Sequence, residues 1–360
     1  MKKIIVLISL MVLCSYMLFA EPPMYVTPSV SGNDIIIEWS DTTNADMYYI
    51  YRSTEPYNNF SKIDSSTSTT YTDIGAAGDT KYFYYVTSFY GDDGFEWIAI
   101  SGGTYTSGPG DTIKTITYNY QIMKYDVTNQ QYVDYLNEAY DLGDVWFYDN
   151  EIYGYYPGDD RIPAGDYIYY DKGWPTYDFN YGRIDWTGSQ FGVKVPDGWD
   201  PGDFDDHPVV DVSWYGAWGF AQHYGLDLPT WPEWEKAARG MTGYDYPWGN
   251  TYDSTNANYN YSGDPFEQGT TPVGMYSGQI FMGFQTTDSP SPYGLYDIVG
   301  NVSQWTESLR WPNNPNQLVI ARIVTYCSWG SSSPSGFYFL KQANPQDIDI
   351  AVGFRCVKRP

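Results

Sequence analysis

The chain has 360 residues, with 19 Lys and Arg against 44 Asp and Glu, so its formal net charge is −25 at pH 7. This charge argues against nucleic acid as a partner, because phosphate backbones are held by clustered Lys and Arg side chains. Aromatic residues make up 19% of the chain and charged residues 18%. This composition excludes a disordered polymer, since so many rings can bury a large apolar area.

Residues 1–20 have the pattern of a secretory signal peptide. Lys2 and Lys3 precede a nearly uncharged apolar run from Ile4 to Phe19, and Ala20 closes it. The run is shorter than the roughly 20 apolar residues that a membrane-spanning helix needs. No later stretch of that length is apolar. We therefore expect an exported protein, whether secreted, periplasmic or at the cell surface, with no membrane span after signal cleavage.

Residues 21–100 predict strands only. Short β-branched and aromatic runs such as DIIIEWS, MYYIYRS and KYFYYVTSFYGDDG alternate with turn residues, which favours an all-β immunoglobulin-like sandwich. Trp39 on the second strand and Tyr82 before the FYYV run resemble a fibronectin type III domain. That resemblance implies a spacer or a ligand-presenting module rather than a catalyst. Residues 101–112, SGGTYTSGPGDT, are then expected to be a flexible linker.

Three short helices are predicted in the remaining domain, residues 113–360. Each begins at a Ser or Thr N-cap, and the first and third caps are followed three residues later by Gln or Glu, as in a capping box. The second and third helices end at a glycine. The caps are Thr128, Ser213 and Thr230, and the glycines are Gly225 and Gly240. The rest of this domain is expected to be mostly irregular.

Five motifs follow one another in a characteristic order in this domain. They read MKYDVTNQQYVDYLN, HPVVDVSWYGAWGFAQHYGLDLPTWPEWEKAARG, YPWGN, YGLYDIVGNVSQWTES and GFRCV. The set resembles the formylglycine-generating enzyme or sulfatase-modifying factor family over roughly residues 115–360. The resemblance implies an α+β C-type-lectin-like domain with much irregular structure. Active members of that family oxidise a sulfatase cysteine to formylglycine, using molecular oxygen and a copper(I) ion held by two cysteines.

The copper-binding cysteines of the family have no counterpart in this chain. The resemblance places them just after a Gly-Gly-Ser-aromatic strand, which reads YCSW here, at residues 326–329. Counting forward, the copper positions fall at Ser331 and Gly336, and neither binds copper as a thiolate does. We therefore expect no copper and no catalytic residues, and a binding or scaffolding module for carbohydrate or extracellular protein. A sulfatase-modifying oxidase with other metal ligands is the alternative.

Calcium is the metal that the resemblance implies. Calcium takes six to eight oxygen ligands, and loops supply many carbonyls. The first expected site uses the Asn258 side chain, the Tyr259 carbonyl and Asp264. The second uses Asp297, the carbonyls of Gly300 and Val302, and Gln304. The alternative is that Asp297 caps a turn and that Gln304 packs in the core.

Two cysteines, Cys327 and Cys356, remain after signal cleavage. An even pair in an oxidising compartment favours one disulfide, which we expect to join neighbouring C-terminal strands. The alternative is two buried thiols that pack as small hydrophobic side chains.

Residues 140–204 concentrate Tyr and Trp among Asp and Gly, as in DVWFYDNEIYGYYPGDDR. Amphipathic rings beside adaptable polar residues suit the recognition of sugars or protein surfaces. The alternative is that these rings fill the interior, and the sequence does not separate the two. The candidate ligand-binding residues are Trp146, Tyr155, Tyr156, Tyr169, Tyr170, Trp174 and Trp186.

Two further groups of acids are weighed against structural roles. The run DGWDPGDFDD, residues 197–206, lacks the spacing of a helix-loop-helix calcium motif, so a solvated acidic loop is favoured, and the adjacent His207 is expected to be structural. Glu233 and Glu235 are candidates for a carboxylate pair of the glycosidase kind. The resemblance implies instead that their helix serves folding.

Overall fold

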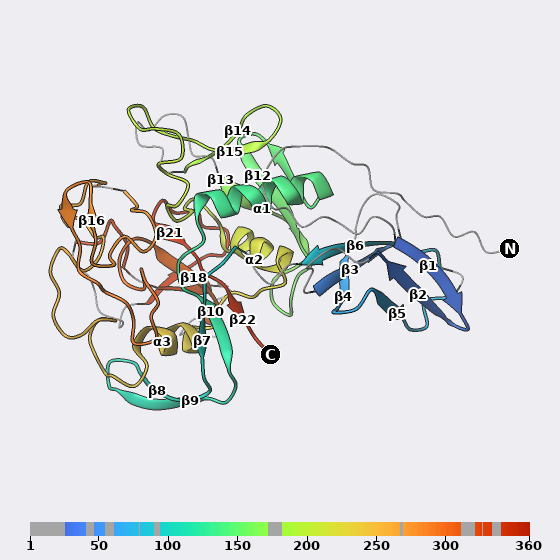
Figure 1. Ribbon diagram of the computed structural model, residues 1–360, viewed down its shortest axis with the longest axis horizontal. Helices are drawn as coiled ribbons and strands as arrows, with labels where there is room; N and C mark the ends of the chain where they lie inside the picture. Colours follow the sequence, from blue (N-terminus) through green and yellow to red (C-terminus); the bar gives the residue numbers. More distant parts are fainter. Residues whose placement is uncertain are drawn as a thin grey trace. The chain divides into compact units, whose positions relative to one another are not determined.

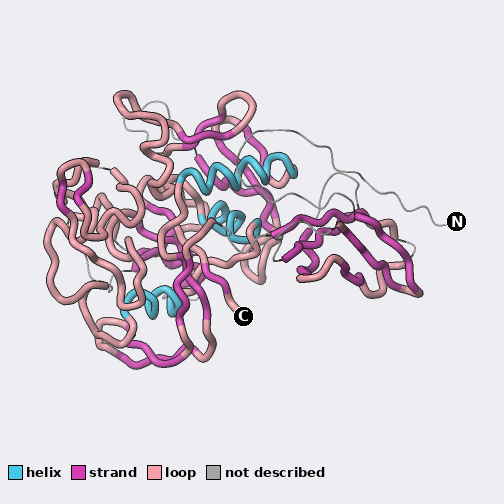
Figure 2. Tube along the Cα trace, in the orientation of Figure 1, coloured by secondary structure: helices cyan, strands magenta, loops and turns pink. Residues whose placement is uncertain are grey.

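The computed structural model divides into two compact units, Met1–Phe95 and Glu96–Pro360 (Figure 1). Loops and turns make up most of the larger unit (Figure 2). No helix in the described part of the chain is long and apolar enough to cross a membrane. The structure describes residues 26–40, 47–54, 61–78, 80–89, 94–171, 182–266, 269–310, 321–325, 327–332 and 340–360. The expected signal peptide, residues 1–20, lies outside these ranges.

The N-terminal unit contains two three-stranded antiparallel sheets. Ile37 and Trp39 from one sheet pack with Tyr48, Ile50 and Val86 from the other in a single apolar core. The described residues of this unit form strands, turns, bends and loops without a helix, as expected, whereas the immunoglobulin-like sandwich and the fibronectin type III resemblance stay predictions. One sheet has the strand order β1 (Val26–Ser31), β2 (Asp34–Trp39), β5 (Thr70–Asp73). The other has the order β4 (Ser61–Ser66), β3 (Met47–Ser53), β6 (Phe83–Phe89).

All three predicted helices are present. The helix α1 (Asn129–Leu142) has a capping box at Thr128, and α3 (Trp231–Arg239) has one at Thr230. The N-cap of α2 (Trp214–His223) is Ser213, whose hydroxyl accepts the Gly216 N–H, and the helix ends one residue before the expected position. A capping box satisfies two backbone N–H groups with side chains three residues apart. The sequence therefore located these helices from local signals alone.

The expected linker, residues 101–112, is part of a β-hairpin in the larger unit, which corrects the domain boundary. The strand β7 (Trp97–Ile100) pairs with β10 (Tyr120–Met123), and β8 (Gly103–Ser107) pairs with β9 (Thr112–Ile116). The hairpin packs against α3 (Figure 1). Buried charged side chains of α3 bind this segment: Glu235 accepts the Ser107 hydroxyl and the Gly108 N–H, and Lys236 donates to the Ser101 and Gly103 carbonyls.

The remaining strands form small sheets, so that the larger unit is an α+β arrangement with much irregular chain. One core cluster joins β7, β8, β9 and β10 to α3 and to residues 293–299. The other sheets have the orders β22 (Val357–Lys358), β10, β7; β11 (Val145–Tyr148), β12 (Glu151–Tyr156), β13 (Gly165–Asp171); β14 (Ile184–Trp186), β15 (Phe191–Val193); β16 (Ile280–Phe281), β17 (Phe284–Gln285); and β20 (Leu340–Ala343), β19 (Ala321–Thr325), β18 (Ser303–Arg310), β21 (Val352–Gly353).

Candidate functional site

Ser331, where the family resemblance places the first copper cysteine, lies in a closed turn. Its N–H donates to the Ser328 carbonyl at 2.9 Å, and its Oγ accepts the Ser328 N–H at 3.0 Å. The Ser331 carbonyl in turn accepts the Asn260 N–H at 3.0 Å. A serine hydroxyl engaged in this way is a poor ligand for Cu(I), which selects soft thiolates. The second position, Gly336, lies outside the described residues.

The expected disulfide is not formed in the structure, where Cys327 and Cys356 are separate buried thiols. The strands expected to hold them do not pair, because Cys327 follows β19 and Cys356 precedes β22, and these strands belong to different sheets. Burial raises the pKa of the Cys356 thiol well above its usual value. Both side chains are buried, and Cys327 packs in an apolar cluster, which agrees with the alternative interpretation. A thiol that stays protonated does not act as a thiolate ligand.

The first expected calcium set already has hydrogen-bond partners within the protein. Asp264 accepts the Phe266 N–H at 2.8 Å through one oxygen, and its other oxygen accepts the hydroxyls of Ser262 and Tyr276. The Tyr259 carbonyl accepts the Ser262 N–H at 2.9 Å. These donors engage the Asp264 and Tyr259 oxygens that a calcium ion would use.

The other members of the two sets lie together in the core. The Asn258 side-chain amide donates to the Gly269 carbonyl at 2.9 Å, and the Asn258 backbone carbonyl accepts the Asn301 N–H at 2.8 Å. A Cβ added at Gly300 would lie 2.6 Å from that carbonyl oxygen, so the chain passes close to Asn258 there. Val302 is buried beside this turn.

The Gln304 side chain makes hydrogen bonds with two side chains and one backbone carbonyl. Its Oε1 accepts the Trp234 indole N–H at 2.7 Å and the Arg355 Nε–H at 2.9 Å, and its amide donates to the Asp297 carbonyl at 3.0 Å. Burial raises the pKa of Asp297 to about 6, and its carboxylate accepts the Gly274 N–H at 2.6 Å. In the second set, a guanidinium and an indole occupy the Gln304 oxygen that a calcium ion would need. Calcium binding stays a prediction, which titration of chelator-treated protein tests.

The acids of α3 do not form a catalytic pair. Both Glu233 oxygens accept hydrogen bonds from Arg359 at 2.9 Å. Burial opposes ionisation of Glu233, but hydrogen bonds from Arg359 and Thr230 outweigh it and lower the pKa of this carboxyl. Glu235 accepts the Ser107 hydroxyl at 2.6 Å and the Gly108 N–H at 2.7 Å. Both acids therefore hold the fold together, as expected.

The candidate aromatic residues separate into core and surface. Tyr156, Tyr169 and Tyr170 are buried, and Trp186 is half-buried. Tyr169 faces inward because α2 covers β13: a Cβ at Gly216 or Gly219 of α2 would clash with Tyr169. The three buried tyrosines fill the core, so their assignment as ligand-binding residues is corrected, whereas that of half-buried Trp186 stays a prediction. Trp174 lies outside the described residues.

Trp146 and Tyr155 are exposed, at 36% and 54%. They point outward because side chains alternate along β11 and β12, so that Trp146, Tyr148, Tyr153 and Tyr155 share one face of the sheet. Trp146 and Tyr153 are cross-strand partners, and their rings stack with centroids 6.2 Å apart. We call these four residues the aromatic face.

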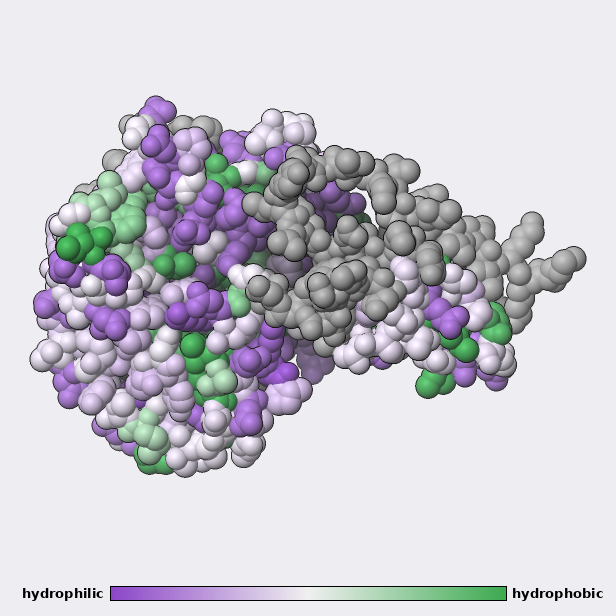
Figure 3. Space-filling model, viewed as in Figure 1, coloured by the Kyte–Doolittle hydropathy of each residue, from purple (hydrophilic) through white to green (hydrophobic). Residues whose placement is uncertain are grey.

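A green, hydrophobic patch lies at one edge of the larger unit, where Figure 1 places β16 (Figure 3). The short hairpin β16–β17 turns at Met282 and Gly283, with φ of 46° and 85°. Two central residues with positive φ are what a type I′ turn requires, and Asn-Gly is its preferred sequence. Met282 is 67% exposed. An exposed methionine therefore occupies the strained position of the turn.

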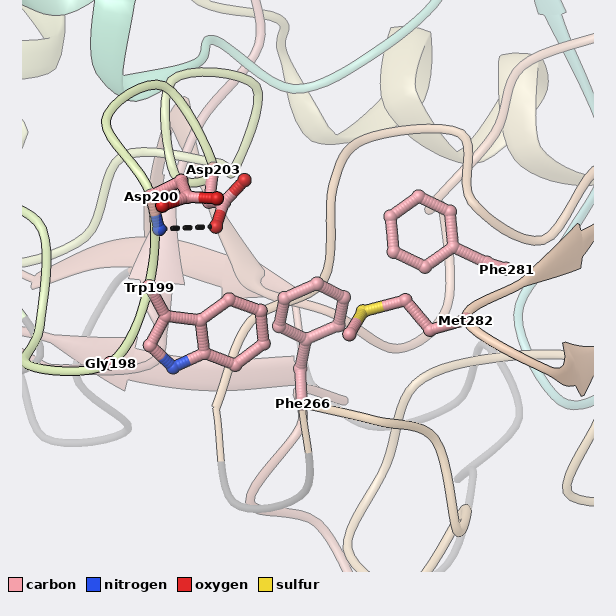
Figure 4. A pocket seen from close by; sticks show the side chains of 7 residues that line it. All are labelled: Gly198, Trp199, Asp200, Asp203, Phe266, Phe281 and Met282. Carbon is pink, nitrogen blue, oxygen red and sulfur yellow. Dashed lines mark hydrogen bonds between the residues drawn. The ribbon is translucent and has the colours of Figure 1, made fainter.

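A pocket of about 520 Å³ opens beside this hairpin (Figure 4). Three segments contribute rings: the acidic loop, the chain after Asp264, and β16. The rings of Trp199 and Phe266 stack with centroids 5.1 Å apart and an interplanar angle of 17°, and Phe266 lies 5.7 Å from Phe281. The lining residues are Gly198, Trp199, Asp200, Asp203, Phe266, Phe281 and Met282.

The loop 197–206 builds one wall of this pocket. Asp200 and Asp203 are exposed at the rim, as expected for a solvated acidic loop, and one Asp203 oxygen accepts the Asp200 N–H at 2.8 Å. Behind them, buried His207 packs 4.7 Å from the Phe266 ring and contacts Thr270 Oγ1 at 3.0 Å. Burial lowers the pKa of His207 to about 3, so the ring is a neutral, structural support.

Sequence reasoning missed Trp199, Phe266, Phe281 and Met282. Two local signals were present: a Trp within the acidic run, and Met-Gly where a two-residue hairpin favours Asn-Gly. Neither predicts that these segments meet, because they are distant in the sequence.

A family model described as the sulfatase-modifying factor enzyme 1-like domain matches residues 91–360. An inactive C-alpha-formylglycine-generating enzyme 2 from Mus musculus is 35% identical over 159 residues, which cover 41% of this chain and 48% of that protein. A formylglycine-generating enzyme from Thermomonospora curvata is 30% identical over 233 residues, 58% of this chain and 69% of that protein. The chain spans between a quarter and about half the length of the curated relatives that it matches first.

Among solved structures, the crystal structure of CarF is similar to this chain with a TM-score of 0.48 and 19% sequence identity. The similarity covers 74% of this chain and 98% of that one.

Proposed function

Because the chain belongs to the sulfatase-modifying factor enzyme 1-like family, we propose that its larger unit is a non-catalytic binding module, exported from the cell, for a carbohydrate or an extracellular protein. The observation that carries the proposal is the state of Ser331. The family resemblance assigns this residue to the first copper ligand, and its hydroxyl is held in a turn by the Ser328 N–H. Oxidation of a substrate cysteine by the family's chemistry needs a thiolate-bound copper ion. The inactive relative in mouse supports a form of the domain without this chemistry.

The pocket beside Trp199 supports a binding role. Its stacked rings present apolar area that costs little conformational entropy to order, and the carboxylates at its rim supply hydrogen-bond acceptors. The aromatic face on β11 and β12 offers a second, flatter surface of exposed rings. We place the ligand at the pocket, because a concave site removes more of a small ligand from water than a flat one does.

A glycan and protein array tests this function. We expect the mature protein to bind one ligand class, and Trp199→Ala to abolish that binding. Ile113→Ala is the matched control, since Ile113 is an exposed apolar side chain on β9, outside the pocket. Absence of binding to any ligand would contradict the proposal, and so would binding that Trp199→Ala leaves unchanged.

The alternative function is a sulfatase-modifying oxidase that holds its metal with other residues. It is favoured by the match to the enzyme of Thermomonospora curvata over 58% of the chain. Within the described residues, no group of three or more His, Cys, Asp or Glu side chains is placed to hold a metal ion. Copper-dependent oxygen consumption with a cysteine peptide separates the two functions.

A further inference from the structure

We propose that the pocket beside Trp199 recognises an organic cation, an alkylammonium or guanidinium group carried by the ligand. This inference rests on the proposed function and specifies the ligand class of the same site. The pocket combines rings from three segments, a strained methionine and two rim carboxylates, and none of its lining residues is basic.

The rings supply the first part of the recognition. A cation within about 6 Å of an aromatic face is attracted by the ring quadrupole, most strongly by Trp. Trp199, Phe266 and Phe281 line one cavity, with neighbouring centroids 5.1 and 5.7 Å apart. The Trp199 and Phe266 rings stack too closely to admit a cation between them, so a cation in the cavity meets the ring faces and edges that this stack leaves open. Figure 4 shows the Met282 side chain reaching toward Phe266, where its polarizable sulfur adds to the contact.

The carboxylates supply the second part. Asp200 and Asp203 belong to the pocket lining, and the hydrogen bond between the Asp200 N–H and the Asp203 carboxylate fixes their relative position. Three more aspartates, Asp197, Asp205 and Asp206, lie in the same loop, and the chain carries a net charge of −25. This field attracts cations and repels anions. A neutral sugar would gain hydrogen bonds here but nothing from the charge.

Met282 gives independent support. A residue other than Gly, Asn or Asp is strained in the left-handed region, and Met282 is mostly exposed, so burial in the core does not compensate for this strain. Strained residues cluster at functional sites, where the strain is kept for a purpose. Met282 lines the pocket, so we infer that its side chain contacts the bound ligand.

Calorimetry of the mature protein tests this inference with choline as an alkylammonium probe and N-acetyl-arginine amide as a guanidinium probe. Maltose and glutarate are the neutral and anionic comparisons. We expect at least one cationic probe to bind, with an affinity that falls as salt is added, and neither comparison to bind. Binding of choline alone would indicate a free small cation as the ligand. Binding of N-acetyl-arginine amide alone would indicate an arginine side chain of a partner protein.

The double variant Asp200→Asn, Asp203→Asn is expected to weaken cation binding at least tenfold. Its matched control is Asp197→Asn, Asp206→Asn, which removes the same charge from the same loop outside the pocket lining and should change the affinity less than threefold. Met282→Asn should weaken binding while raising the unfolding temperature, because Asn fits the turn. A fall in both quantities would contradict the role of Met282.

The outcomes separate this inference from the proposed function. Binding of maltose or of an array glycan, unchanged in the Asp200→Asn, Asp203→Asn variant, would overturn the cation while leaving the binding module in place. Equal weakening by the control variant would overturn the pocket as the cation site. Absence of binding to every probe and to the whole array would overturn both proposals.

Discussion

Cys327 has a backbone φ of 145°, in a region that favours glycine, and it stands where the family resemblance places a glycine. A side chain forced into such a conformation costs about 1–3 kcal/mol. We expect Cys327→Gly to unfold at a higher temperature than Cys327→Ala, although it removes one more buried carbon. Thermal unfolding followed by circular dichroism compares the unfolding temperatures of the two variants.

Cys356 provides the control for this comparison, since it is also a buried thiol and is not among the residues with positive φ. There Ala should be more stable than Gly, because Gly loses more backbone freedom on folding. The same order at both positions would contradict a strained Cys327.

Asp211 makes the folded state sensitive to pH. Burial and the neighbouring carboxylates of Asp171 and Asp349 raise the pKa of Asp211 to about 7. In the unfolded chain an Asp has a pKa of about 3.9. As the pH rises between these values, the unfolded chain releases the proton while the folded chain keeps it, so this group's contribution to the free energy of unfolding falls. Above about pH 7 both states are ionised and the loss levels off.

The variant Asp211→Asn should not show this loss. Its side chain keeps an acceptor oxygen and tolerates the φ of 59° that Asp211 has. We expect its unfolding temperature to exceed that of the wild type by more at about pH 8 than at about pH 5. A pH-independent difference between the two proteins would contradict the raised pKa.

At the scale of elements, helix ends were predictable and the β8–β9 hairpin was not. The N-caps at Thr128, Ser213 and Thr230 act within one turn of the helix that they start, so their sequence signals are local. The hairpin depends on Glu235, more than 120 residues away from Ser107. Its Gly, Ser and Thr composition is typical of a linker unless that distant partner is known.

Glu235→Ala tests how much the hairpin depends on α3. The change leaves the Ser107 hydroxyl and the Gly108 N–H without their buried acceptor, and a buried unsatisfied donor costs about 1–3 kcal/mol. We expect urea unfolding to show a loss of that size or more, and amide hydrogen exchange to accelerate in residues 103–116. The control, Glu138→Ala, removes an acid that pairs with His223 at the surface and should cost less than about 1 kcal/mol. Equal losses would contradict the role of Glu235.

The direction of each ring in residues 140–204 also depends on elements. Alternation along β12 explains why Tyr155 is exposed and Tyr156 is buried. The sequence contains this period, but it does not say which face α2 covers. The pocket was harder to predict, because Trp199, Phe266 and Met282 come from three segments that only the folded domain brings together.

At the scale of the whole molecule, the family was predictable because its motifs keep their order along the chain, and the match to residues 91–360 confirms it. The boundary between the two units was not predictable. It lies near residue 95, ahead of the expected start of the larger domain at residue 113. The first strand of the larger unit, β7, precedes the motifs that identify the family, and it pairs with β10 across some twenty residues.

The role that we propose for this member of the family is binding without catalysis. Oxygen consumption by the copper-treated protein, with a cysteine-containing sulfatase peptide as substrate, tests it most directly, and an active formylglycine-generating enzyme serves as the positive control. We predict no peptide-dependent consumption above that of peptide and copper alone, because Ser331 offers no thiolate. Consumption that depends on both protein and peptide, with conversion of the peptide cysteine to formylglycine, would contradict the account.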